Sequence, residues 1–157
     1  MEIDKILNPF KDSVIHVFNT MLNLEPLAED AINVLEREIT SDITGTIGVI
    51  GDITGTASVR FPRALACRIA SLMMGTEIHE INNVVKDAIG EIANMVTGGA
   101  KGILIQLHEI SYKLAIPTVI LGSDHTLSYP TGITVKAIPF IIDDQKFYLE
   151  ICLKNGE

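Results

Sequence analysis

The chain has 157 residues and carries a formal net charge of −8. A chain of this length usually forms one domain with a core of its own, so we expect a single domain over residues 1–157. A negatively charged surface repels a phosphate backbone, and the lysines and arginines are scattered along the chain, so we expect no nucleic-acid partner.

The apolar segments and the cysteines also exclude several classes of protein. The longest apolar runs, residues 114–121 and 137–142, are much shorter than the roughly 20 residues of a membrane-spanning helix. Residues 1–8 are charged and lack the apolar stretch of a signal peptide, so we expect a cytoplasmic location without membrane contact. Cys67 and Cys152 form no CxxC pair, and the four histidines lack metal-ligand spacing, which argues against a metal site.

Residues 4–24 are predicted to form an amphipathic helix, because their apolar residues recur at spacings of three and four. Pro9 is expected at the start of the regular part of this helix. Leu24 and Glu25 precede Pro26, and the residue before a proline is disfavoured in a helix, so the helix is expected to end there. The apolar stripe consists of Ile6, Leu7, Phe10, Val14, Val17, Phe18, Met21 and Leu22.

Residues 43–61 change to a period of two, with apolar residues at odd positions and polar residues at even positions. This alternation predicts strands with one buried face, and it leaves Arg60 on the polar face. Gly51 and Asp52 lie between two such runs and are expected to form a tight hairpin turn.

The rest of the chain is predicted to contain two helices and three more strands. Pro62 is expected to begin a short helix that ends at Gly75, and a longer helix is expected from about residue 82 to residue 108. Asp143 and Asp144 are expected to join the last two strands in a turn. The predicted strands are residues 116–121, 133–140 and 146–153. The predicted fold class is therefore α+β, with helices covering one face of a largely antiparallel sheet.

The long predicted helix has two different faces when its residues are placed at about 100° intervals. Glu91 and Asn94 lie three residues apart on the polar face, so their side chains are expected to project side by side into solvent and to act on one bound group. The apolar face, expected to be core, consists of Val85, Ile89, Ile92, Ala93, Val96, Ala100, Ile103, Leu104 and Leu107. The opposite face carries Asp87, Gly90, Glu91, Asn94, Gly98, Lys101 and Gly102.

Gly98, Gly99 and Gly102 conflict with this helical pattern, because each glycine in a helix interior costs about 0.5–1 kcal/mol relative to alanine. Three explanations are open: another protein approaches the helix backbone, a neighbouring helix packs closely, or the helix ends early. The E-x-x-N spacing by itself is not specific, since Glu80 and Asn83 form a second match and a solvated helix face is the commoner reason for one.

The stretch from Asp87 to Gly99, with the sequence DAIGEIANMVTGG, resembles the signature helix of the CheC/CheX/FliY family of chemotaxis phosphatases. The similarity continues in the same order over residues 24–26, 51–61, 64–75 and 117–122. CheC-like members carry two E-x-x-N helices, whereas the first predicted helix here has none, so the chain is most similar to the CheX-like subgroup.

The resemblance implies a phosphatase that dephosphorylates the aspartyl phosphate of a CheY-type response regulator in chemotaxis signalling. It implies that Asn94 orients the attacking water and that Glu91 pairs with a lysine of the receiver domain. Mg²⁺ would be supplied by the receiver domain, with no cofactor held by this chain. A homodimer is also implied. The residues expected to contact the partner are Asp87, Gly98, Lys101 and Gly102.

Two other functions are compatible with the same residues. The domain could recognise a receiver domain or a flagellar-motor component without catalysis. It could also be an oligomerisation module in which the edge of the sheet pairs with a second copy.

Overall fold

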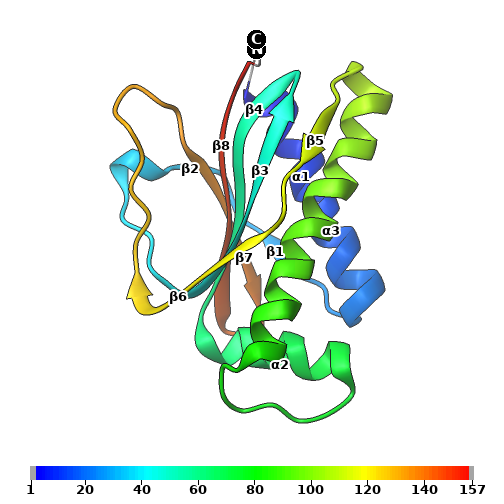
Figure 1. The fold of residues 1–157 in the computed structure, drawn as a ribbon, viewed down its shortest axis with the longest axis vertical. Coiled ribbons are helices and arrows are strands. Elements are labelled where there is room, and N and C mark those ends of the chain that lie inside the picture. Colours follow the sequence, from blue (N-terminus) through cyan, green and yellow to red (C-terminus); the bar gives the residue numbers. More distant parts are fainter. Residues whose placement is uncertain (1–2, 156–157) are drawn as a thin grey trace.

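The strands of the protein form one antiparallel sheet, and its two longest helices lie together against one face of that sheet (Figure 1). The computed structural model describes residues 3–155. The helices are α1 (Ile3–Val17), α2 (Arg63–Met74) and α3 (Asn83–His108), with a π-helical turn η1 (Phe18–Leu22) and a 3-10 turn η2 (Val34–Glu36). The strands are β1 (Leu27–Ala28), β2 (Ile32–Asn33), β3 (Ser41–Gly51), β4 (Ile53–Phe61), β5 (Tyr112–Leu114), β6 (Thr118–His125), β7 (Lys136–Ile142) and β8 (Gln145–Asn155).

The sheet has the strand order β1-β7-β8-β4-β3-β5, with β2 beside β7 and β6 beside β3. Neighbouring strands pair antiparallel throughout this order. In Figure 1, α1 and α3 run beside each other on one side of the sheet and α2 closes its lower end. The predicted class, α+β with helices over one face of an antiparallel sheet, is confirmed.

Four stacked phenylalanines occupy the centre of the core between the sheet and the helices. The ring of Phe147 lies 4.9 Å from that of Phe18 and 5.1 Å from those of Phe61 and Phe140, measured between centroids. Each of the four side chains is fully buried. The four rings come from η1, β4, β7 and β8. Because aromatic side chains bury large apolar areas, this cluster contributes strongly to holding these elements together.

The first helix begins earlier than its proline predicts. Pro9 is buried inside α1, so its expected position at the start of the helix is wrong. Ile6 and Leu7 precede Pro9 and are buried in the core. Their packing favours helix before the proline, so the helix begins several residues earlier than the preference of proline for a first turn predicts. The helix ends at Asn23, which adopts a left-handed conformation with φ of 54° just before the expected exit.

The boundaries of the other two helices agree with the prediction to within one residue, since Pro62 was expected as the first helical residue of α2. Pro62 is the extended N-cap of α2, and Gly75 ends that helix in a left-handed conformation with φ of 68°. The side chain of Asn82 caps α3 by accepting a 3.0 Å hydrogen bond from the backbone N–H of Val85. None of the glycines interrupts α3, which continues to His108.

The hairpin and the later strands are found where they were expected, with shifted ends. β3 and β4 meet at Gly51 and Asp52, and Asp143, with φ of 55°, turns the chain between β7 and β8. β6 begins at Thr118 and reaches His125, whereas the predicted strand covered residues 116–121.

The prediction that β3 and β4 bury only one face is wrong. Thr44, Ser58 and Arg60 occupy the polar positions of the alternation, yet no more than 2% of each is exposed. Segments distant in the sequence cover this second face: Arg60 donates hydrogen bonds to the carbonyl oxygens of Ile39 and His125, at 3.0 and 3.2 Å. Polar side chains can be buried here because each finds a partner.

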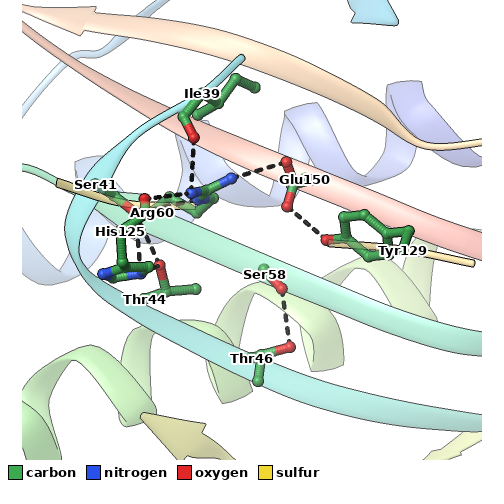
Figure 2. Close-up of polar contacts among 9 residues, drawn as sticks. All are labelled: Ile39, Ser41, Thr44, Thr46, Ser58, Arg60, His125, Tyr129 and Glu150. Atoms are coloured by element: carbon green, nitrogen blue, oxygen red, sulfur yellow. Dashed lines mark hydrogen bonds and ion pairs between the residues drawn. The ribbon is translucent and has the colours of Figure 1, made fainter. Parts of the chain in front are cut away.

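Figure 2 shows the buried ion pair at the centre of this polar layer. The guanidinium of Arg60 lies 3.0 Å from the carboxylate of Glu150 and also donates to the hydroxyl of Ser41 at 3.1 Å. Tyr129 donates its phenolic hydrogen to the other oxygen of Glu150. These bonds join β3, β4 and β8 to the end of β6 and the segment that follows it. We therefore assign this polar layer a structural role and not a catalytic one.

Candidate functional site

Helix α3 presents Glu91 and Asn94 on its outer side. Ile92 and Ala93 lie between them in sequence and are buried, which fixes the rotation of the helix. Side chains three residues apart on a helix have Cβ atoms roughly 5–6 Å apart, so this carboxylate and this carboxamide can reach one group together. Glu91 is exposed, as expected, whereas Asn94 is half-buried.

The outer side of α3 has an unexpected neighbour one helical turn from Asn94. Gly90, predicted on the outer face, is buried: a Cβ added there would lie 3.5 Å from Cγ2 of Val119 and 3.7 Å from Cβ of Pro117. The start of β6 therefore forms one wall of the site, and Asn94 lies one helical turn beyond Gly90 on that side. Sequence reasoning did not place this wall at the site.

The three glycines of α3 have different roles. A Cβ on Gly99 would lie 2.4 Å from the hydroxyl oxygen of Ser13, so this glycine allows α1 to pack closely on α3. A Cβ on Gly98 or Gly102 would meet no atom within 4 Å. The packing explanation therefore holds for Gly99, and the early end of the helix is wrong. Gly98 and Gly102 leave open backbone on the side of Asn94, four and eight residues beyond it.

Several charges of α3 are available to a partner. Asp87 is exposed and Lys101 is half-buried, and both lie on the same side of the helix as Glu91. None of these three takes part in the ion pairs found among residues 3–155. Those ion pairs are Arg60–Glu150, Arg68–Asp143 and Lys146–Glu29, and His79 lies 3.5 Å from Glu77, with which it pairs when protonated.

Other candidate sites on the chain are weaker. Glu80 precedes the first residue of α3, so the second E-x-x-N match does not form a pair on one helix face. Burial raises the pKa of the Cys67 and Cys152 thiols, which disfavours the reactive thiolate form. Within residues 3–155, no group of three or more His, Cys, Asp or Glu side chains could hold a metal ion. No helix in that range is both long and apolar enough to cross a membrane.

Comparison with known proteins decides which family has this fold and site. The model of the family described as chemotaxis phosphatase CheX matches residues 43–141, which include the whole of α3. The chain belongs to the CheX family of chemotaxis phosphatases. The predicted family and its CheX-like subgroup are confirmed, and with them the predicted class of enzyme, a phosphatase of chemotaxis signalling.

Individual CheX proteins match over almost the full chain. The CheY-P phosphatase CheX of Thermotoga maritima is 27% identical over 155 residues, which are 97% of each chain. The crystal structure of CheX from Vibrio vulnificus is 32% identical and has a TM-score of 0.89, over 96% of this chain and 99% of that one. A chain of the CheX–CheY–BeF3–Mg²⁺ complex of Borrelia burgdorferi, 18% identical, shares the fold with a TM-score of 0.81 over 96% and 98% of the two chains.

Proposed function

We propose that this phosphatase hydrolyses the aspartyl phosphate of a CheY-type response regulator and that Glu91 and Asn94 are its catalytic residues. The observation that supports the proposal is the exposed carboxylate and the half-buried carboxamide one turn apart on the outer side of α3, in a member of the CheX family. The Thermotoga maritima relative is a CheY-P phosphatase, which favours the same substrate class here.

Asn94 has the chemistry to position water. Hydrolysis of an acyl phosphate requires a water molecule in line with the phosphorus and the leaving oxygen. A carboxamide offers both an acceptor and donors, so its oxygen can accept a hydrogen bond from the attacking water while its NH₂ donates to a phosphoryl oxygen. Asn94 is half-buried, so its side chain has less freedom than that of a fully exposed asparagine, and a restricted carboxamide holds water more effectively than a mobile one.

Glu91 has the chemistry to fix the register of docking. Its exposed carboxylate has no ion-pair partner among residues 3–155, so a lysine of the regulator can form a charge-assisted hydrogen bond with it. A lysine beside the phosphoryl group would place that group over Asn94. The Mg²⁺ that neutralises phosphoryl oxygens in this reaction class would be held by the regulator.

The partner is expected to cover the outer side of α3 around this pair. Asp87 and Lys101 offer one charge of each sign, and Gly98 and Gly102 leave the helix backbone open to close approach. This arrangement suits a protein substrate, whose own backbone or loops can lie against the helix.

The finer organisation of the protein is part of the same proposal. β6 pairs with β3 on one side, and its other edge has no strand beside it among residues 3–155, so a second copy could add there to give a homodimer. We place the protein in the cytoplasm with its substrate. Residues 1–157 would form one domain, because β1 and β8 belong to a single sheet.

A dephosphorylation assay tests the proposal. The regulator is phosphorylated with an excess of a small phosphodonor, and phosphate release is followed with the protein at a small fraction of the regulator concentration. We expect multiple turnovers with the wild type and a loss of kcat of at least about 100-fold in Asn94→Ala, with binding retained. Glu91→Ala should mainly weaken binding.

Asn8→Ala, which truncates an exposed asparagine on α1, is the matched control and should behave as the wild type. Wild-type turnover in Asn94→Ala would refute the assignment of this residue. Binding without any turnover by the wild type would instead identify a receiver-binding module that lacks phosphatase activity.

A further inference from the structure

The segment between β5 and β6 exposes an isoleucine beside the proposed catalytic pair. Ile116 is 87% exposed, more than any other large apolar side chain of residues 3–155. Single exposed apolar residues are common on protein surfaces and need no functional reason. The position of Ile116 along α3 is what distinguishes it.

Two contacts fix the segment against α3. Tyr112, in β5, donates its hydroxyl hydrogen to the backbone carbonyl of Thr97 at 2.8 Å. Further along the segment, Pro117 and Val119 lie against Gly90. As the segment runs from Tyr112 to Val119, its contacts on α3 move backwards from Thr97 to Gly90, so the two run in opposite directions.

Ile116 lies between these two contacts. The backbone at Ile116 therefore passes the part of α3 between residues 90 and 97, which contains Glu91 and Asn94. The backbone N–H of Ala115 donates a 2.9 Å hydrogen bond to the carbonyl of Gly48 in β3, so the segment is held to the sheet just before Ile116. The exposed side chain is thus presented from a fixed backbone.

A second exposed apolar side chain lies further along the same segment. Leu121 is 48% exposed and lies two residues beyond Val119, so it faces the same side of β6. Leu121, Ile81 and Arg63 line a hollow of about 280 Å³ between β6 and the start of α2. The segment from Ala115 to Leu121, which packs on α3 at Gly90, thus carries two exposed apolar side chains, Ile116 and Leu121, and we call it the flank of the site.

We propose that this flank, with Ile116 as its main contact, is a docking surface for the receiver domain of the phosphorylated regulator. The inference rests on the proposed function, because the contact at Gly90 joins the flank directly to the site. Pro117 and Val119 lie against Gly90, one helical turn from Asn94, so a protein that brings a phosphoryl group to Asn94 also comes close to this segment. An apolar contact beside polar catalytic groups is the usual anatomy of a specific interface.

Ile116→Asp tests the proposal, with Leu107→Asp as the matched control. Leu107, contrary to its expected place in the core, is 66% exposed, and it lies near the far end of α3 from the site. We expect Ile116→Asp to raise the KM for phosphorylated regulator by at least about tenfold with kcat within about twofold of wild type, as loss of one central interface contact would. Leu107→Asp should leave both constants unchanged. Circular dichroism checks that both variants fold.

An unchanged KM in Ile116→Asp would overturn the inference and leave the catalytic role of Asn94 untouched. A loss of dimer in the same variant, measured by sedimentation, would also overturn it and assign Ile116 to contacts between copies. If the wild type shows no turnover, the proposed function fails by itself, and titration of the phosphorylated regulator onto wild type and Ile116→Asp decides whether this flank binds it.

Discussion

The hydroxyl of Ser13, on α1, donates a 2.6 Å hydrogen bond to the backbone carbonyl of Val96 on α3. This bond crosses from one helix to the other at the point where Gly99 lacks a side chain. Val96 follows Asn94 by two residues, so the contact between helices also fixes the part of α3 that presents the proposed catalytic pair. Close packing at this point therefore connects the stability of the fold to the geometry of the site.

Gly99→Ala should destabilise the protein, although alanine favours a helix by about 1 kcal/mol over glycine. The added Cβ would lie 2.4 Å from Oγ of Ser13 and would force that hydroxyl out of its bond. We expect a net loss of about 1–3 kcal/mol in the free energy of unfolding, measured in urea, because a buried polar group loses its partner.

Two controls isolate this clash. Ser13→Ala removes Oγ and leaves a Cβ 3.4 Å from the added methyl group, so the double variant Ser13→Ala/Gly99→Ala should be more stable than the sum of the single losses predicts. Gly98→Ala meets no atom within 4 Å and should stabilise the protein by up to about 1 kcal/mol. Equal effects of alanine at positions 98 and 99 would contradict the packing explanation.

Glu150→Gln should be among the most damaging single substitutions in the sheet. It leaves the guanidinium of Arg60, 1% exposed, without a counter-charge in the polar layer of Figure 2. Removing one partner of a buried ion pair costs about 3–5 kcal/mol. Asp143→Asn, which breaks the exposed ion pair with Arg68, should change stability by less than about 1 kcal/mol. Thermal unfolding of both variants distinguishes the two cases.

Stability should fall at alkaline pH through the buried tyrosines. Burial, together with the charge of Glu150 and a hydrogen bond to it, raises the pKa of Tyr129, and burial raises the pKa of Tyr112. Above about pH 10 the unfolded chain loses these protons while the folded chain retains them, so the stabilisation is complete below that pH and declines as pH rises. Urea unfolding between pH 8 and 11 measures the decline.

Tyr129→Phe is the control for this pH dependence. It removes the tyrosine whose pKa is raised both by burial and by Glu150. The decline in stability should therefore be less steep, while Tyr112 still contributes. The same variant leaves one oxygen of Glu150 without its donor, so its stability at neutral pH should be lower than that of the wild type by about 1–3 kcal/mol. A decline as steep as that of the wild type would exclude Tyr129 as a cause.

The elements that sequence reasoning placed correctly are those with local signals. Asn82 and Gly75 are capping residues next to a helical period, and Gly51 provides the freedom of a hairpin turn, so each boundary depends on a few neighbouring residues. Glu91 was placed correctly for the same reason, because the rotation of α3 follows from its own apolar stripe.

Features that depend on distant residues were not predictable in this way. The choice among the glycine explanations depended on Ser13, which belongs to another helix. The burial of Arg60 depended on Glu150 and Tyr129, and the burial of Gly90 depended on the start of β6. Hydrophobic periodicity shows which face of an element is apolar, but it does not show what covers the other face.

Gly98→Phe should separate activity from stability. A side chain at this position points into open space, so the folded protein should be at least as stable as the wild type in urea. The ring would stand one helical turn beyond Asn94, where the proposed partner must approach the helix backbone. We expect kcat/KM for dephosphorylation to fall by at least about tenfold, since steric exclusion at an interface core costs more than about 1.4 kcal/mol. Gly102→Phe lies a further turn away and should cause a smaller loss, so full activity in Gly98→Phe would show that the partner does not use this side of α3.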